Sequence, residues 1–232
     1  MRNLKNAVLT AILVLGITSA FAQKTLKNAT VTYQMSTDAM NPQTNEEMTI
    51  NMELVLKVLN KKAAIDMNMN LMGMQMNMKT SLDTESKNGI LLMDVMGQKM
   101  AAKINPADYD TMKSQNKVET PQSVEKTNKT KTILGYLCKH AIVTGKDGSV
   151  SDVYYTEKLN NLDIDGANQV AISGVDGLPL EYVTKAHGAT ITVTVEGIEE
   201  NTVKASDFMS SIPEGYTEVT YEQLTSMGGA GM

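Results

Sequence analysis

Aromatic residues are scarce in this chain of 232 residues, which contains no tryptophan, two phenylalanines and eight tyrosines. The core therefore has to be filled by aliphatic side chains and by methionine, of which there are 18. Basic residues are also in the minority, with 21 lysines and arginines against 26 aspartates and glutamates. Because this balance leaves no basic patch, we expect no nucleic-acid partner.

Cysteine occurs once, at Cys138, which excludes a disulfide within the chain. Since an unpaired thiol in an oxidising compartment is best protected by burial, we predict that Cys138 is buried in a strand. A reactive or metal-binding role is the alternative. His140 lies two positions along and would face the same side of that strand. No orienting acid is evident, and burial raises a thiol pKa, so we expect no enzyme.

The first 22 residues have the pattern of a secretory signal peptide. Arg2 and Lys5 precede an apolar run from Ala7 to Ile17, and small residues stand at Ala20 and Ala22. A retained anchor is the alternative, but the run is shorter than the ~20 residues needed to span a bilayer. We expect cleavage after Ala22 and a soluble periplasmic or secreted protein without an integral membrane segment. Losing two basic residues leaves 19 against 26 acidic ones, a net charge of −7 on 210 residues.

Residues 23–226 are predicted to form a single antiparallel β domain, because alternating apolar and polar residues recur along them. The expected strands are 26–35, 48–58, 65–71, 74–79, 89–95, 99–104, 125–134, 136–143, 150–156, 180–186, 190–196 and 202–205. The polar segments 36–46 and 115–124 are expected as a loop and as a linker or flap. Residues 227–232 are expected to be a disordered tail.

Two short helices are also expected. Asn105 can cap a helix that begins at Pro106 and ends near Ser114. Thr220 and Gln223 fit a capping box for a final helical turn or two. The predicted fold class is therefore mainly β, a curved antiparallel sheet with a few short helices.

The segment from Ile65 to Lys79, IDMNMNLMGMQMNMK, has the densest methionine pattern. Its methionines change from odd to even positions, and a two-residue turn at Met72-Gly73 accounts for this change. Because Met72 would then need a positive φ, a loop of three or four residues is the alternative. With the short turn, one face of the hairpin is apolar. Together with two residues of the preceding strand, the predicted ligand-binding face consists of Met67, Met69, Leu71, Met74, Met76, Met78, Met52 and Leu54.

A further pattern occupies the second half of the chain. The run ILGYLCKHAIV is followed by Asp147-Gly148, by VYYTEKL and by GVDGLPLE from Gly174 to Glu181. This pattern resembles uncharacterised secreted bacterial families such as the GLPGLI family, which are thought to belong with the LolA/LolB-like lipoprotein carriers. The resemblance implies a half-barrel of antiparallel strands that shelters acyl chains, and it includes no catalytic motif.

Two segments have features of a metal site, but no metal is expected at either. Alternating methionines could hold Cu(I), but an apolar strand face explains the same spacing. The loop from Asn161 to Gly166 resembles half of a calcium loop, yet Ile172 stands where its glutamate should be. We therefore expect no cofactor and a binder or carrier of a hydrophobic ligand, a lipid or a lipidated polypeptide. The alternatives are a non-enzymatic structural or protein-interaction module of the envelope and, third, a Cu(I)-binding protein.

Overall fold

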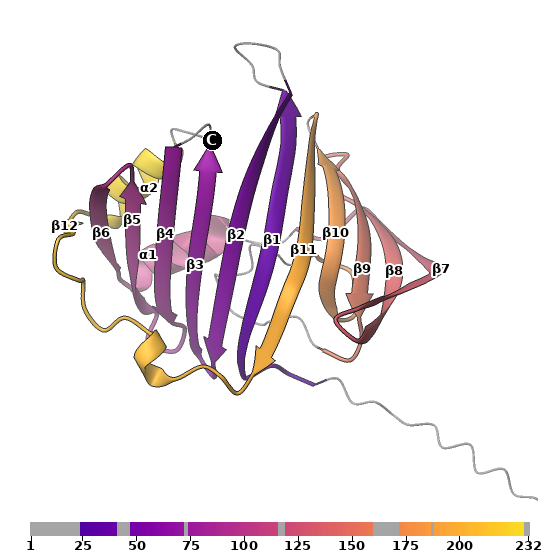
Figure 1. The fold of residues 1–232 in the computed structure, drawn as a ribbon, viewed down its shortest axis with the longest axis horizontal. Helices are drawn as coiled ribbons and strands as arrows, with labels where there is room; N and C mark the ends of the chain where they lie inside the picture. The colour runs from indigo at the N-terminus through magenta and orange to yellow at the C-terminus, as the bar shows by residue number, and fades with distance from the viewer. Residues whose placement is uncertain are drawn as a thin grey trace, which may run out of the picture.

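A computed structural model describes residues 24–40, 47–71, 74–115, 119–159, 172–186 and 188–229. The predictions for the signal peptide, for the turn at residues 72–73 and for the calcium-like loop concern residues outside this part. The described residues form one sheet of 12 strands with few short helices (Figure 1). None of these helices is both long enough and apolar enough to span a bilayer.

The sheet consists of two antiparallel meanders that meet at the β1–β11 pair. The first contains β1 (Asn28–Met40), β2 (Glu47–Leu59), β3 (Lys62–Leu71), β4 (Met74–Asp83), β5 (Asn88–Val95) and β6 (Gln98–Ile104). Helix α1 (Pro106–Gln115) follows. The second meander begins at the opposite edge and contains β7 (Ser123–Ile133), β8 (Tyr136–Thr144), β9 (Val150–Thr156), β10 (Leu178–Ala186) and β11 (Ala189–Glu200). The segment between β6 and β7 thus joins the two ends of one sheet, since only β12 lies outside β6 and β7 is the opposite edge strand.

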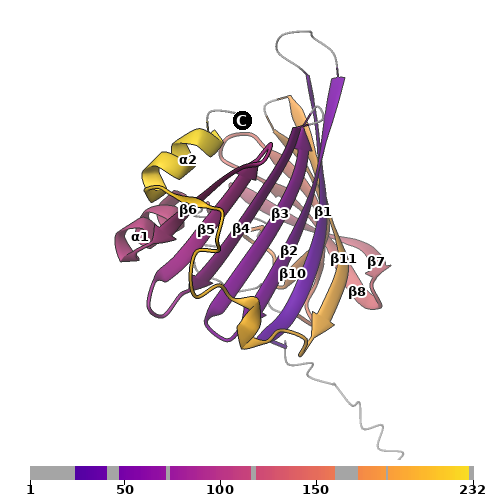
Figure 2. The same ribbon diagram turned by 60° about the vertical axis from the view of Figure 1, so that its left-hand side comes forward.

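The chain ends with the short helix η1 (Ala205–Asp207), strand β12 (Thr217–Glu218) and helix α2 (Tyr221–Gly229). Strand β12 pairs in parallel with β6, and both α-helices contact β6 (Figure 2). The strand order is β12-β6-β5-β4-β3-β2-β1-β11-β10-β9-β8-β7. The prediction of a mainly β, antiparallel fold with a few short helices is confirmed, and the sheet is open and uncurled.

Three predicted boundaries are corrected. Strand β1 continues through Ser36–Met40, which was expected to be a loop, because its backbone pairs with β2 along its full length. Residues 202–205 form no strand; the side-chain amide of Asn28 binds both backbone groups of Val203 there. Helix α2 runs to Gly229, so the tail expected from residue 227 begins inside it.

The hydrophobic core lies on one face of the sheet, which we call the core face. Strands β1 and β2 alternate as expected, and Val31, Tyr33 and Leu56 are at most 2% exposed. Helix α1 adds Tyr109, and helix α2 adds Leu224. Both helices have the predicted caps: the Asn105 side chain accepts the N–H groups of residues 107 and 108, and the residue pair 220 and 223 forms the reciprocal capping box.

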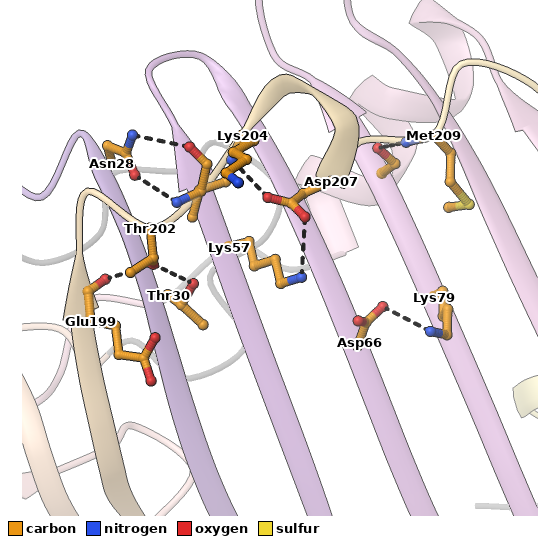
Figure 3. Close-up of polar contacts among 12 residues, drawn as sticks. Asn28, Thr30, Lys57, Asp66, Lys79, Glu199, Thr202, Lys204, Asp207 and Met209 are labelled. Atoms are coloured by element: carbon orange, nitrogen blue, oxygen red, sulfur yellow. Dashed lines mark hydrogen bonds and ion pairs between the residues drawn. The ribbon is translucent and has the colours of Figure 1, made fainter.

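The opposite, outer face is crossed at one end by residues 201–216, which we call the strap (Figure 3). Nζ of Lys57 lies 3.7 Å from an oxygen of Asp207, and the backbone N–H of Met209 donates to Ser81 at 3.1 Å. A second, small apolar cluster forms beneath the strap, in which buried side chains of β5 and β6 meet half-buried side chains of the strap: Ile90, Leu92 and Ala101 with Met209, Ile212 and Tyr216.

Candidate functional site

The methionine hairpin has the predicted register. Strands β3 and β4 pair Met67 with Met78, Met69 with Met76, and Leu71 with Met74. On the outer face, Asp66 lies opposite Lys79, and their charged groups are 3.8 Å apart (Figure 3). The pairing of residues 71 and 74 leaves two residues between the strands, as the short turn requires.

Because register continues from strand to strand, the methionines form two rows across the core face. The inner row contains Leu54, Met67, Met78, Met93 and Met100. The outer row also lies on the core face, one step nearer the ends of the strands. It contains Met35, Met52, Met69 and Met76. Directly opposite side chains in antiparallel strands have Cβ atoms about 5 Å apart, so neighbours within a row are in contact range.

On β2 and β3, exposure increases from the inner row to the outer row. Leu54 and Met67 are only 2% and 8% exposed, and they belong to the core. All four methionines of the outer row are half-buried, and those at positions 35 and 52 pack against the core. Met74, beyond the outer row, is 43% exposed. The predicted ligand-binding face is therefore divided: Leu54 and Met67 belong to the core, whereas Met78 is half-buried like the four methionines of the outer row.

The accessible part lies at one end of the strands of the first meander. The carboxyl ends of β1, β3 and β5 share this end with the amino ends of β2, β4 and β6, at the top of Figure 1. Met96, in the β5–β6 turn, is 71% exposed, and its backbone N–H donates to Gln75 of β4 at 3.3 Å. Met40, at the end of β1, is 52% exposed. Met40 and Met96 were not among the predicted site residues, although the predicted meander places the ends of β1 and β5 at this end.

The prediction for Cys138 is confirmed: it lies in β8 and is fully buried. Burial raises the pKa of its thiol to about 11, so the thiolate is scarce at neutral pH. The expectation that His140 has no orienting acid is wrong. Its Nε2 is 2.7 Å from a carboxylate oxygen of Asp152, and its Nδ1 is 2.8 Å from the hydroxyl of Thr127. With both nitrogens engaged, the ring has none left for the thiol.

This arrangement joins three strands, because Thr127, His140 and Asp152 come from β7, β8 and β9. An ionised Asp152 accepts the Nε2 proton, so a neutral ring accepts the Thr127 hydroxyl proton at Nδ1. The hydroxyl oxygen in turn accepts the N–H of Lys129 within a bulge of the edge strand. A fully buried histidine satisfied in this way fastens edge strand β7 to the sheet, and we assign it a structural role. The register could have revealed Asp152, since it is the diagonal neighbour of His140.

The chain belongs to the family described as "Domain of unknown function (DUF4412)", whose model matches residues 36–216. No curated protein matches the sequence. Among solved structures, one described as "Structure of PNGF-II in P21 space group" is similar over 87% of this chain, with 16% identity and a TM-score of 0.40. The chain covers 33% of that structure. The comparisons do not confirm a relation to the GLPGLI family or to LolA-like proteins.

Proposed function

We propose that this protein is a periplasmic or secreted binder or carrier of a hydrophobic ligand, a lipid or a lipidated polypeptide, and that the ligand contacts the outer row. One observation carries the proposal: Met35, Met52, Met69 and Met76 lie in register on four adjacent strands and are all only half-buried. On β2 and β3 their inner-row neighbours Leu54 and Met67 are at most 8% exposed, so the outer row continues a packed apolar surface into an accessible region. On β4 the accessible region also includes the inner-row residue Met78, which is half-buried.

Methionine suits such a surface for a physical reason. Its side chain is unbranched and polarisable, so it can adapt to acyl chains of different shape at little cost. A ligand that completes the burial of the outer row gains roughly 25 cal/mol for each Å² of apolar surface removed from water. The acidic chain offers no general attraction for an anionic membrane surface, so binding at the outer row has to come from apolar contact.

Two measurements test this proposal. Native mass spectrometry of protein purified from the secreted or periplasmic fraction should detect a co-purifying lipid. Titration with an uncharged apolar dye, N-phenylnaphthylamine, should give saturable fluorescence that declines when Met69 and Met76 are replaced by alanine. A protein that carries no lipid and binds no dye would instead be a structural or protein-interaction module.

Cu(I) binding is the third candidate, after the structural or protein-interaction module, because the outer row places thioether sulfurs on neighbouring strands and soft thioethers select Cu(I). Replacement by leucine separates the two functions. Met69→Leu with Met76→Leu retains an apolar surface but removes two sulfurs, so dye binding should persist while Cu(I) binding, measured by competition with a chromogenic chelator, should be lost. If the unmodified protein cannot compete with the chelator, the copper function is wrong.

A further inference from the structure

A groove of about 570 Å³ lies on the outer face, on the opposite side of the sheet from most of the core. The side chain of Ile90 belongs to its floor, and Phe208, Met209 and Ile212 of the strap line its other side. Its size is within the range typical of small-molecule sites, and these four side chains give it an apolar part.

The polar part of the groove contains one cation without a counter-ion. Lys103 and Glu218 line the groove and neutralise each other at 2.8 Å. Lys62 also lines it, and among the residues that the structure describes it has no ion-pair partner. Asp83 lies opposite it in the β3–β4 register, but an Asp83 oxygen accepts the backbone N–H groups of residues 85 and 86 in the turn. These hydrogen bonds hold the carboxylate at the turn and partly satisfy its charge.

We infer that the groove binds a single-chain amphiphile with an anionic headgroup, whose hydrocarbon part lies along the apolar lining formed by Phe208, Met209 and Ile212 and whose headgroup pairs with Lys62. The apolar lining and the ammonium group of Lys62, which is unpaired within the described part of the chain, both support this occupant. The protein as a whole carries a net charge of −5, so it repels anions in general. A preference for an anionic ligand therefore has to come from local contacts, of which Lys62 provides the clearest.

The test uses a dansyl-labelled undecanoic acid and its methyl ester, which differ in headgroup charge and by one methyl group. The acid should bind about fivefold more tightly than the ester, as expected for one partly exposed ion pair. Lys62→Glu should remove this preference, and Lys61→Glu is the matched control, because Lys61 is exposed and does not line the groove. Ser210→Trp, at an exposed position of the lining, should block the groove and weaken the acid at least tenfold. Ser206→Trp, elsewhere on the strap, should have no effect.

Two results would overturn the inference. If acid and ester bind equally well and respond to Met76→Gln but not to Ser210→Trp, the amphiphile occupies the outer row, and the proposed function stands without the groove. If the acid is preferred but Lys61→Glu weakens it as much as Lys62→Glu does, the preference comes from general surface charge. Circular dichroism of each variant should show that the sheet is retained. Positions 61, 62, 206 and 210 are exposed, and position 76 is half-buried.

Discussion

The methionine hairpin allows a graded test within one strand face. Met67 and Met69 are neighbours on the same face of β3, yet Met67 is 8% exposed and Met69 is half-buried. Met67→Ala leaves a cavity in the core and should reduce the free energy of unfolding by roughly 2–5 kcal/mol. Full burial of a methionine is worth roughly 1.5–3 kcal/mol, so half burial suggests a loss of about 1 kcal/mol for Met69→Ala.

The same reasoning extends across the hairpin turn. Met76 is half-buried opposite Met69, so Met76→Ala should also cost about 1 kcal/mol. Met74 is 43% exposed, and Met74→Ala should change the free energy of unfolding by less than about 0.5 kcal/mol. The order of stability loss is therefore expected to be Met67, then Met69 and Met76 together, then Met74.

The assay measures two quantities on each variant: the free energy of unfolding from denaturant titration followed by circular dichroism, and the affinity for the uncharged apolar dye. Dye affinity should decline most for Met69→Ala and Met76→Ala, which are the variants with intermediate loss of stability. If these two variants lose as much stability as Met67→Ala and the unmodified protein binds no dye, the outer row is ordinary core, and the reasoning is refuted.

Three further predictions concern polar groups. Cys138 should resist a bulky maleimide in the native protein and react after unfolding, because it is buried and its pKa is raised to about 11; rapid native labelling would contradict this. Asp152→Ala should cost roughly 1–3 kcal/mol in denaturant titration, because it leaves a nitrogen of buried His140 unpaired, and an unchanged midpoint would contradict the structural role. The backbone N–H of Lys204 and the nearby Lys57 lower the pKa of Asp207, because both interact favourably with its ionised carboxylate. The strap should therefore be anchored at neutral pH and should loosen as the carboxylate is protonated, at pH values below the ordinary aspartate pKa near 4. Hydrogen exchange of the backbone amides of residues 201–216 should be slow at neutral pH and faster at acidic pH. In the Asp207→Asn variant these amides should exchange quickly both at neutral pH and at acidic pH.

Local patterns in the sequence predicted the features that depend on neighbouring residues. The face of β1, the hairpin register and both helix caps are of this kind, because strand alternation and capping depend on positions a few residues apart. The loop expected at Ser36–Met40 was wrong for the same reason. These residues are polar, but β1 continues because partners in β2 are present, and the hydroxyl of Thr49 donates to Asp38 at 2.6 Å.

Contacts between distant parts of the chain were not predictable in this way. The pairing of β1 with β11 joins residues more than 150 positions apart, as in Val31 with Ile198, and nothing in either strand identifies its partner. The strap was missed because side chains of distant strands hold it, including Asn28 and Ser81. The division of the methionine face into core and accessible rows also depends on which elements cover the sheet, and strand periodicity contains no information about that cover.

The continuation of the outer row into the second meander bears on whether methionine merely replaces the missing aromatic residues. Beyond Met35 the same row passes through Val193, Tyr182, Val153 and Ala141, each at most 7% exposed. A chain that used methionine only as core filler would have placed it there as well. Instead, the fully covered half of the row contains β-branched, aromatic and small residues, and its methionines occupy the half that is only partly covered. Methionine in this row therefore coincides with incomplete burial. This favours the interpretation that the methionines form an adaptable apolar contact surface, and it argues against the interpretation that they only replace missing aromatic residues in the core.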